Sequence, residues 1–251
     1  MMRQYAKPLG KALASATIMA LIATIIWSQS LTWLGTLPGY VGSGARGVSA
    51  DGSVVVGEAF TAAWQYRAFR WTAAGGMQDL GSLGGAESRA YGVSADGSVV
   101  VGLAYNAYGL DRAFRWTAAG GMQDLGSLTA GGYSRAYGVS ANGSVVVGVA
   151  LNAARSSHAF RWTAVGGMED LGTLGGNFSE ARGVSADGSV VVGQAANAAG
   201  QLRAFRWTAA EGMVNLGTLG GPWSWASGVS ADGSVVVGVS YNAARQFRAF
   251  R

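Results

Sequence analysis

The chain has 251 residues, of which 49% are apolar, 12% are charged and 41 are glycine. With only three prolines, it is neither collagen-like nor a proline-rich disordered chain, and its glycine, valine and aromatic content favours short strands joined by tight turns. The absence of cysteine excludes disulfides, Cys-ligated metal sites and a thiol nucleophile.

The first thirty residues differ from everything after them. Three basic residues precede an uncharged apolar stretch over 12–27, and Ser28-Gln29-Ser30 places small residues where a signal peptidase cleaves. This pattern predicts a signal peptide over 1–30, with an uncleaved N-terminal anchor as the alternative. The apolar stretch is shorter than the ~20 residues of a membrane-spanning helix, which favours cleavage. In either case the rest of the chain is expected to leave the cytoplasm, and membrane contact is expected only through an uncleaved segment.

Removing this segment lowers the formal net charge from +5 to +2, because it holds three basic and no acidic residues. The remaining arginines are spread at regular spacing rather than clustered. A nucleic-acid partner is therefore not expected.

Residues 31–251 are predicted to form one repeat domain. The phrase Gly-Val-Ser-Ala-(Asp/Asn)-Gly-Ser-Val-Val-Val-Gly begins at Gly47, Gly92, Gly138, Gly183 and Gly228. The phrase Ala-Phe-Arg begins at Ala68, Ala113, Ala159, Ala204 and Ala249. Both recur every 45 or 46 residues, which predicts repeats starting near 45, 88, 134, 179 and 224.

Each repeat is expected to contain four short strands. In the first repeat these cover about 45–50, 53–59, 68–72 and 77–83. Asp51-Gly52 is interpreted as a two-residue type I′ turn with positive φ at both residues.

A four-residue loop over 73–76 would place Arg70 opposite Asp79 in the next strand. The same register predicts the facing pairs Arg115–Asp124, Arg161–Asp170 and Arg206–Asn215.

Four antiparallel strands per repeat of this length predict an all-β fold, a β-propeller of four-stranded blades. A parallel β-solenoid is the competing interpretation, but a two-residue hairpin turn argues against it. The segment 34–37 matches the end of a fourth strand, and the last repeat stops inside its third strand. We therefore expect five blades, the last closed by the N-terminal strand through pairing near 249–251. A truncated piece of a longer array is the alternative.

The repeats resemble the bacterial HAF-repeat family, which is named for a His-Ala-Phe triplet and described as an extracellular repeat. The resemblance is fullest over His158-Ala159-Phe160-Arg161-Trp162 and the following Met168-Glu169-Asp170-Leu171-Gly172-Thr173-Leu174-Gly175-Gly176. Other repeats have arginine in place of the histidine. The resemblance covers about 34–251 and implies export and a surface or extracellular location. It implies no activity and no catalytic residues.

No set of residues in the sequence points to catalysis, a metal or a cofactor, so the chain is expected not to be an enzyme. His158 is interpreted as a variant of the repeated arginine position, and the aspartates of the Asp-Gly turns as turn residues. A glycoside hydrolase, the enzyme alternative, would need two convergent carboxylates. The candidates outside the repeated phrases are Glu58, Glu87, Asp111, Glu180 and Glu211.

Sequence variation between repeats concentrates in two loops that a propeller places on one face. Rigid scaffolds usually carry binding residues on such loops, and exposed aromatic side chains suit sugar or protein ligands. The candidate binding residues are Trp64, Tyr66, Tyr108, Tyr133, Phe178, Trp223, Trp225 and Phe247. We therefore expect a non-catalytic scaffold that binds an unidentified protein or glycan, with a purely structural surface repeat as the alternative.

Overall fold

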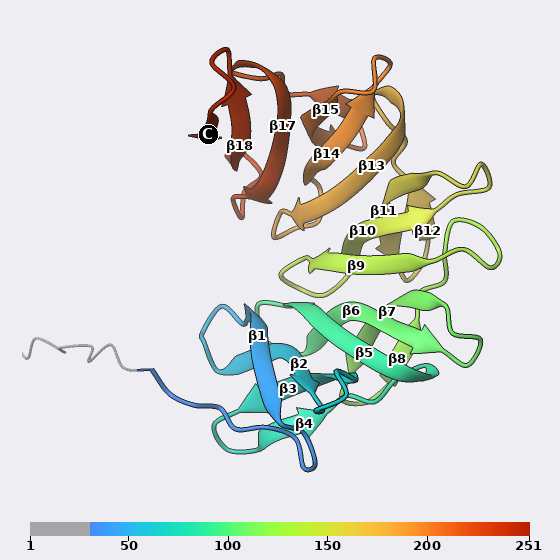
Figure 1. Cartoon of the computed structure of the whole chain (residues 1–251), viewed down its shortest axis with the longest axis vertical. Helices are drawn as coiled ribbons and strands as arrows, with labels where there is room; N and C mark the ends of the chain where they lie inside the picture. The colour runs from blue at the N-terminus through green and yellow to red at the C-terminus, as the bar shows by residue number, and fades with distance from the viewer. Residues whose placement is uncertain (1–30) are drawn as a thin grey trace, which may run out of the picture. The chain divides into compact units, whose positions relative to one another are not determined.

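The computed structural model describes residues 31–251, so the predicted signal peptide over 1–30 lies outside the described residues. Every regular element from 31 to 251 is a β-strand, and within that range there is no helix that could cross a membrane. Residues 34–251 form one compact unit of five sheets, which we call blades, following one another in chain order (Figure 1).

The strands are as follows. The first blade contains β1 (Gly42–Val48), β2 (Val54–Phe60), β3 (Tyr66–Thr72) and β4 (Gly76–Asp79). The second contains β5 (Gly84–Val93), β6 (Val99–Asn106), β7 (Asp111–Thr117) and β8 (Gly121–Asp124). The third contains β9 (Ser134–Val139), β10 (Val145–Leu151), β11 (Ser157–Thr163) and β12 (Gly167–Asp170). The fourth contains β13 (Gly175–Val184), β14 (Val191–Asn197), β15 (Leu202–Thr208) and β16 (Gly212–Asn215). The fifth contains β17 (Gly220–Val229), β18 (Val236–Asn242) and β19 (Phe247–Phe250).

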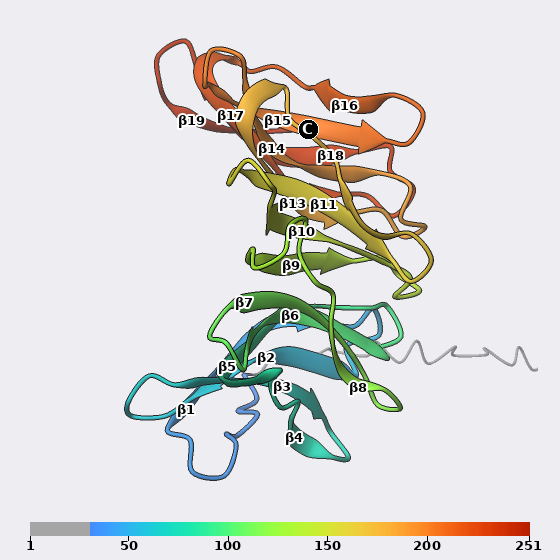
Figure 2. The same cartoon turned by 90° about the vertical axis from the view of Figure 1, so that its right-hand side faces the viewer.

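In every blade, strands that are consecutive in the chain pair with each other in antiparallel fashion. The predicted class, an all-β propeller of antiparallel blades, is therefore confirmed. Figure 2 shows the blades as layers stacked from β1–β4 to β17–β19. The parallel solenoid is excluded because its coils would pair strands in parallel.

Each blade buries one face against its predecessor. Val54 and Val56 of the first blade pack against Phe114 and Trp116 of the second, and Phe114 is fully buried. The same contact recurs between the second and third blades and between the third and fourth. The Val-Val-Val and Ala-Phe-Arg-Trp phrases are thus the two halves of one repeated interface, and their burial stabilises the array by the hydrophobic effect.

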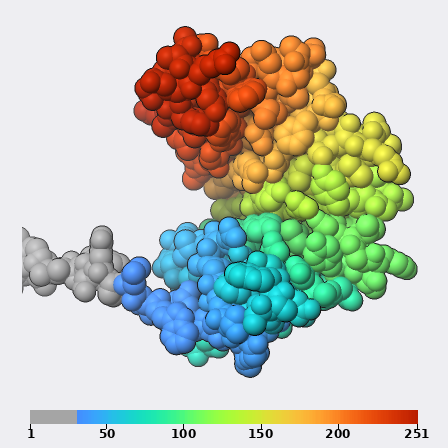
Figure 3. All heavy atoms as spheres, in the orientation of Figure 1, coloured from blue at the N-terminus to red at the C-terminus, as the bar shows by residue number. Residues whose placement is uncertain are grey.

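Backbone hydrogen bonds also join the blades, one at each turn between the first and second strands. The amide of Ala50 donates to the carbonyl of Ala95 at 2.9 Å, and Ala95 donates to Ala141 at 3.0 Å. The series continues through Ala186 to Ala231 in the fifth blade. It ties all five blades together at the same level, and Figure 3 shows the resulting surface coloured in chain order.

The turn at Asp51-Gly52 was predicted wrongly. Gly52 has a positive φ of 74°, but Asp51 is not among the residues with positive φ. The last pair before the turn is Val48 opposite Val55, and the Gly52 amide donates to the Ser49 carbonyl at 3.0 Å. An Asp51 carboxylate oxygen accepts hydrogen bonds from Ser49 and Ser53, and these bonds stabilise a longer loop than a type I′ hairpin.

The register between the third and fourth strands differs from the prediction by one residue. Trp71 lies opposite Met77 and Arg70 opposite Gln78, so Arg70 does not face Asp79. The loop is one residue shorter than expected because Gly76, at φ 64°, pairs with Thr72. The facing pairs predicted for the other blades are wrong in the same way: Arg115 faces Gln123, Arg161 faces Glu169 and Arg206 faces Val214.

The aspartates of the predicted facing pairs nevertheless have cationic partners. In each of these blades the partner is the residue directly before the Ala-Phe-Arg phrase. Arg67 lies 3.9 Å from Asp79 in the first blade. Arg112 lies 3.8 Å from Asp124 in the second, and His158 lies 2.9 Å from Asp170 in the third. His158 thus occupies the place that arginine holds in neighbouring blades, as its interpretation as a repeat variant requires.

The predicted closure of the fifth blade is also wrong. That blade has three strands in the order β17-β18-β19, and residues 34–37 form no strand. Leu37 is instead buried against Ala59 and Phe69 of the first blade. Ser43 Oγ donates to the Gly35 carbonyl at 2.8 Å, as Ser88 does to Gly81 at 2.5 Å. The segment therefore matches the link that follows a fourth strand and docks onto the next blade, not the strand itself.

Candidate functional site

The first strand of every blade contains a β-bulge at the same place. In the second blade Ala90 pairs with Gly102 and Gly92 pairs with Val101, so Tyr91 is an extra residue without a partner. The equivalent shift occurs in the other first strands. The bulge residues are Arg46, Tyr91, Tyr137, Arg182 and Ser227. A bulge turns its side chain out of the regular alternation of a strand, and bulges are frequent next to functional sites.

The last residue of the Val-Val-Val-Gly phrase lies opposite this bulge, where there is no room for a side chain. A Cβ placed on Gly102 would lie 2.0 Å from the carbonyl oxygen of Arg89, and one on Gly148 would lie 1.9 Å from that of Arg135. Any side chain there would overlap the backbone of the neighbouring strand. The repeated glycine therefore permits the bulge, while the residue at the bulge is free to vary.

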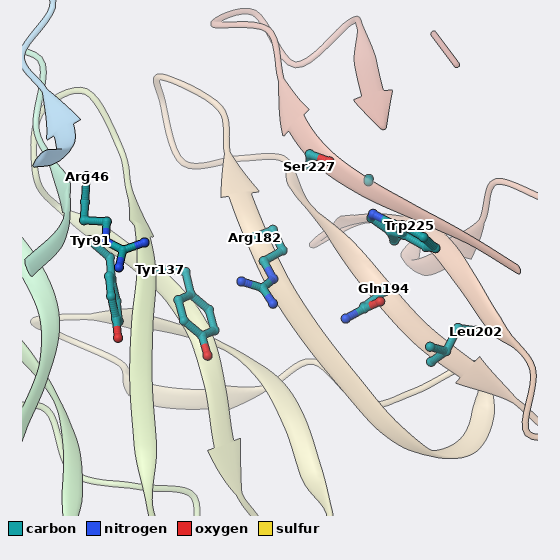
Figure 4. Close-up of a pocket in the computed structure, with 9 residues that line it drawn as sticks. Arg46, Tyr91, Tyr137, Arg182, Gln194, Leu202, Trp225 and Ser227 are labelled. Carbon is teal, nitrogen blue, oxygen red and sulfur yellow. The ribbon is translucent and has the colours of Figure 1, made fainter. Parts of the chain in front are cut away.

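The five bulge residues line one pocket of about 710 Å³ (Figure 4). First strands of consecutive blades contact one another, which brings their bulges into a row. The remaining lining residues are Gln194, Leu202, Trp225 and Ala226. We call this the bulge pocket; its volume is in the range of small-molecule sites.

Two tyrosines form the middle of the row. The rings of Tyr91 and Tyr137 have centroids 5.7 Å apart and are tilted by 38°. The guanidinium carbon of Arg182 lies 4.6 Å from the centre of the Tyr137 ring. Burial raises the pKa of both tyrosines above the ordinary value of 10.0, so both are neutral at physiological pH. They present flat apolar faces with polar hydroxyl ends.

The two arginines of the row are held from behind by buried carboxylates. Arg46 binds Glu58 through two nitrogen atoms, with contacts of 2.6 and 2.9 Å, and Arg182 lies 2.8 Å from Glu180. The arginine side chains are 55% and 45% exposed, whereas those of Glu58 and Glu180 are 7% and 9% exposed. The hydrogen bond to Glu58 and then the charge of Glu58 raise the pKa of Arg46 above its ordinary value. Cationic N–H donors, rather than carboxylates, therefore face the pocket.

The arrangement is suited to binding. The five carboxylates considered for a hydrolase each lie beside an arginine: Glu58, Glu87, Asp111, Glu180 and Glu211. Over residues 31–251 there is no group of three metal-ligating side chains of the His, Cys, Asp or Glu type. What the pocket offers is hydrogen-bond donors and aromatic faces.

The eight residues predicted to bind ligand do not form one surface by mutual contact. Trp225 lines the bulge pocket. Its ring meets that of Phe247 at 5.6 Å, Phe247 meets Tyr241 at 4.2 Å, and Tyr241 meets Trp223 at 5.6 Å. We call these four residues of the fifth blade the aromatic cluster.

The other predicted residues lie in separate places. Trp64 stacks on Phe60 at 5.1 Å, and Tyr66 lies beneath the guanidinium of Arg89 at 3.7 Å. Tyr133 forms a hydrogen bond with Ser157, and Tyr108 is 89% exposed. Phe178 lies within β13 and is half-buried.

The sequence-based prediction included none of the five bulge residues and also missed Gln194; of the residues that line the pocket it named Trp225 alone. A signal was present: the residue directly before Gly-Val-Ser is Arg, Tyr, Tyr, Arg and Ser in the five repeats, between an invariant alanine and an invariant glycine. Variation at one position inside a constant phrase marks a place that the framework does not constrain.

Comparisons with known proteins support the fold. No protein-family profile matches the chain, and no curated protein sequence matches it. Among solved structures it is similar to TolB from Acinetobacter baumannii, with a TM-score of 0.50 and 16% identity over 68% of this chain and 41% of that one. It is similar to a protein described as TolB from Agrobacterium tumefaciens, with a TM-score of 0.56 and 16% identity over 81% and 71%. A prolyl endopeptidase gives a TM-score of 0.52 and 13% identity over 80% and 32%. At these identities the likeness concerns the propeller fold alone.

Proposed function

We propose that this chain is an exported, non-catalytic β-propeller repeat protein that binds a protein or glycan ligand through the bulge pocket. The observation that carries the proposal is the convergence of the variable bulge residues on one pocket of about 710 Å³. The surrounding framework repeats almost unchanged, so the residues that differ between blades are those that could give the protein a particular ligand.

Export rests on two sequence features. The N-terminal segment has the three parts of a secretory signal, and the repeats resemble the extracellular HAF-repeat family. The proposed location is the cell surface, the extracellular medium or the periplasm, and fractionation of cells expressing the full chain tests it. Recovery of the repeat domain in the cytoplasm with an intact N-terminus would contradict export.

Binding is favoured over catalysis because the carboxylates near the pocket are paired with arginines. Hydrolysis of a glycoside needs one carboxyl group as an acid and a second as a base or nucleophile. Neither Glu58 nor Glu180 lines the bulge pocket; each is bound to the arginine that does, Arg46 or Arg182. The groups that remain available can hold a ligand but do not form a catalytic pair.

The test is binding of the mature chain to arrays of glycans and of surface proteins, with two variants in parallel. Tyr137→Ser places in the third blade the residue that the fifth blade has at this position. It is expected to abolish the binding that the unmodified chain shows. Trp223→Ala combined with Trp225→Ala tests the aromatic residues predicted from the loops. If both variants bind every ligand as the unmodified chain does, the proposed pocket is wrong, and a purely structural repeat becomes the better explanation.

A further inference from the structure

The bulge pocket continues directly into the aromatic cluster of the fifth blade. Trp225 belongs to both, since it lines the pocket and its ring lies 5.6 Å from that of Phe247. Trp223 is 44% exposed and Phe247 is 54% exposed. A surface of cationic donors and tyrosine rings therefore leads into a surface of exposed aromatic rings, which indicates an elongated ligand rather than a compact one.

This surface is made of side chains from five blades. Arg46 comes from β1, Tyr91 from β5 and Tyr137 from β9. The fourth and fifth blades add Arg182 and Trp225. One way in which an extended peptide binds is to add itself as a strand to one sheet edge. A ligand that follows the row instead meets side chains contributed by every blade, so its recognition depends on rings and hydrogen-bonding groups rather than on a peptide backbone.

The groups along the row match the chemistry of an acidic sugar chain. Aromatic faces pack against the apolar faces of sugar rings, and arginine donates paired hydrogen bonds to a carboxylate. Gln194 adds an amide, already within 3.1 Å of Glu180, that can contact hydroxyl groups. Because Glu58 and Glu180 lie behind the arginines, their negative charge is the less exposed part of each ion pair.

Building on the proposed binding function, we propose that the ligand is an acidic oligosaccharide. Carboxylates on its sugar rings bind Arg46 and Arg182, its rings pack on Tyr91 and Tyr137, and it continues across Trp225 to the aromatic cluster.

Calorimetric titration of the mature chain with oligogalacturonate, and with the same oligomer after reduction of its carboxyl groups, tests this proposal. The acidic form is expected to bind at least about tenfold more tightly than the reduced form, since loss of a charge-assisted hydrogen bond weakens binding by this order. Raising the salt concentration should weaken only the acidic form. Equal affinity for the two forms would overturn the acidic part of the proposal.

Two substitutions locate the contact. Arg182→Gln is expected to reduce affinity for the acidic oligomer about tenfold, and Trp223→Ala to reduce affinity for both forms. Arg155→Gln and Trp64→Ala are the matched controls, because both residues are exposed and neither lines the pocket. Circular dichroism and thermal unfolding confirm that each variant is folded. Controls that weaken binding as much as the pocket variants would contradict the assignment.

Failure of this proposal can be distinguished from failure of the proposed function. If neither oligomer binds but a protein on the array does, and Arg182→Gln abolishes that binding, the pocket is a protein site and the saccharide proposal is wrong. If pocket variants alter no binding of any kind, both proposals are wrong.

Discussion

The turns between first and second strands and the bulges in the first strands lie only a few residues apart, yet they behave in opposite ways. Every turn has the sequence Ser-Ala-(Asp/Asn)-Gly-Ser and the same hydrogen bonds, and each joins its neighbour by a backbone bond between alanines. The bulge position holds arginine, tyrosine or serine. The turn is constrained by the next blade as well as by its own, whereas the bulge side chain faces the pocket. The array therefore repeats where blades are joined by backbone hydrogen bonds and buried side chains, and it varies where side chains line the pocket.

The largest effect on stability is expected from replacing the glycine that permits a bulge. Gly148→Ala is expected to destabilise the fold by about 3 kcal/mol or more, because its Cβ would lie 1.9 Å from the Arg135 carbonyl oxygen. Chemical denaturation measures the effect. The control is Gly44→Ala, whose Cβ would lie 3.6 Å from the nearest atom, in the Glu58 carboxylate, and which should change stability little. Equal stability of the two variants would show that the bulge is not held by this glycine.

A buried serine tests the framework at one interface. Ser179 Oγ accepts from the Ala159 amide at 2.8 Å and donates to the Gly172 carbonyl at 2.5 Å, linking the third and fourth blades. Ser179→Ala is expected to cost about 1–3 kcal/mol, since it leaves two backbone groups without their partner. Denaturation of this variant is compared with Ser189→Ala, which removes an exposed hydroxyl. A larger loss from the exposed site would contradict the role given to Ser179.

The aspartates of these turns should make the free energy of unfolding depend on pH in the acid range. Hydrogen bonds from the preceding serine hydroxyl, then from the following serine, lower the pKa of Asp51, Asp96, Asp187 and Asp232 from 3.8 to about 2. Because the pKa of each aspartate is lower in the folded state than in the unfolded state, its ionised form stabilises the fold. This stabilisation is complete above about pH 4 and is lost as the pH falls toward 2.

Replacing all four aspartates by asparagine should flatten the change in melting temperature between pH 4 and pH 2. Asn142 already makes the same serine contacts in the third blade, so the substitution preserves the turn. An unchanged slope would show that other carboxylates determine the acid response.

The smallest effect on stability is expected at the bulge itself. Tyr137→Ser removes the ring that packs on Tyr91 and beneath Arg182, at a cost of about 1 kcal/mol. Combined with the loss of binding proposed for the same variant, this result would separate framework from site. A cost as large as that of Gly148→Ala would mean that the bulge residue is part of the framework after all.

Much of the architecture could be predicted from the repeat, but the register could not. Strand number and the antiparallel order follow from the spacing of the phrases, whereas the shift that pairs Arg70 with Gln78 depends on the backbone conformation of Gly76. Of the eight residues predicted to bind ligand, Trp225 lies in the pocket and two others join its aromatic cluster. Trp225 was predicted because its segment was expected to be a loop, although it lies within β17 in the structure. Tyr91 and Tyr137 were not predicted, because they lie in segments expected to be first strands.

A repeat of about 45 residues with fixed turn and apolar phrases has few ways to bury its apolar side chains other than as an array of four-stranded antiparallel units, so this much follows from the sequence. Only the tertiary structure decided where the variable residues meet. Five positions separated by 45 or 46 residues share one pocket because each lies at a bulge, and the packing of blade on blade aligns these bulges in a row. Residues 34–37 likewise dock on the first blade through the same serine-to-carbonyl hydrogen bond that joins every later pair of blades.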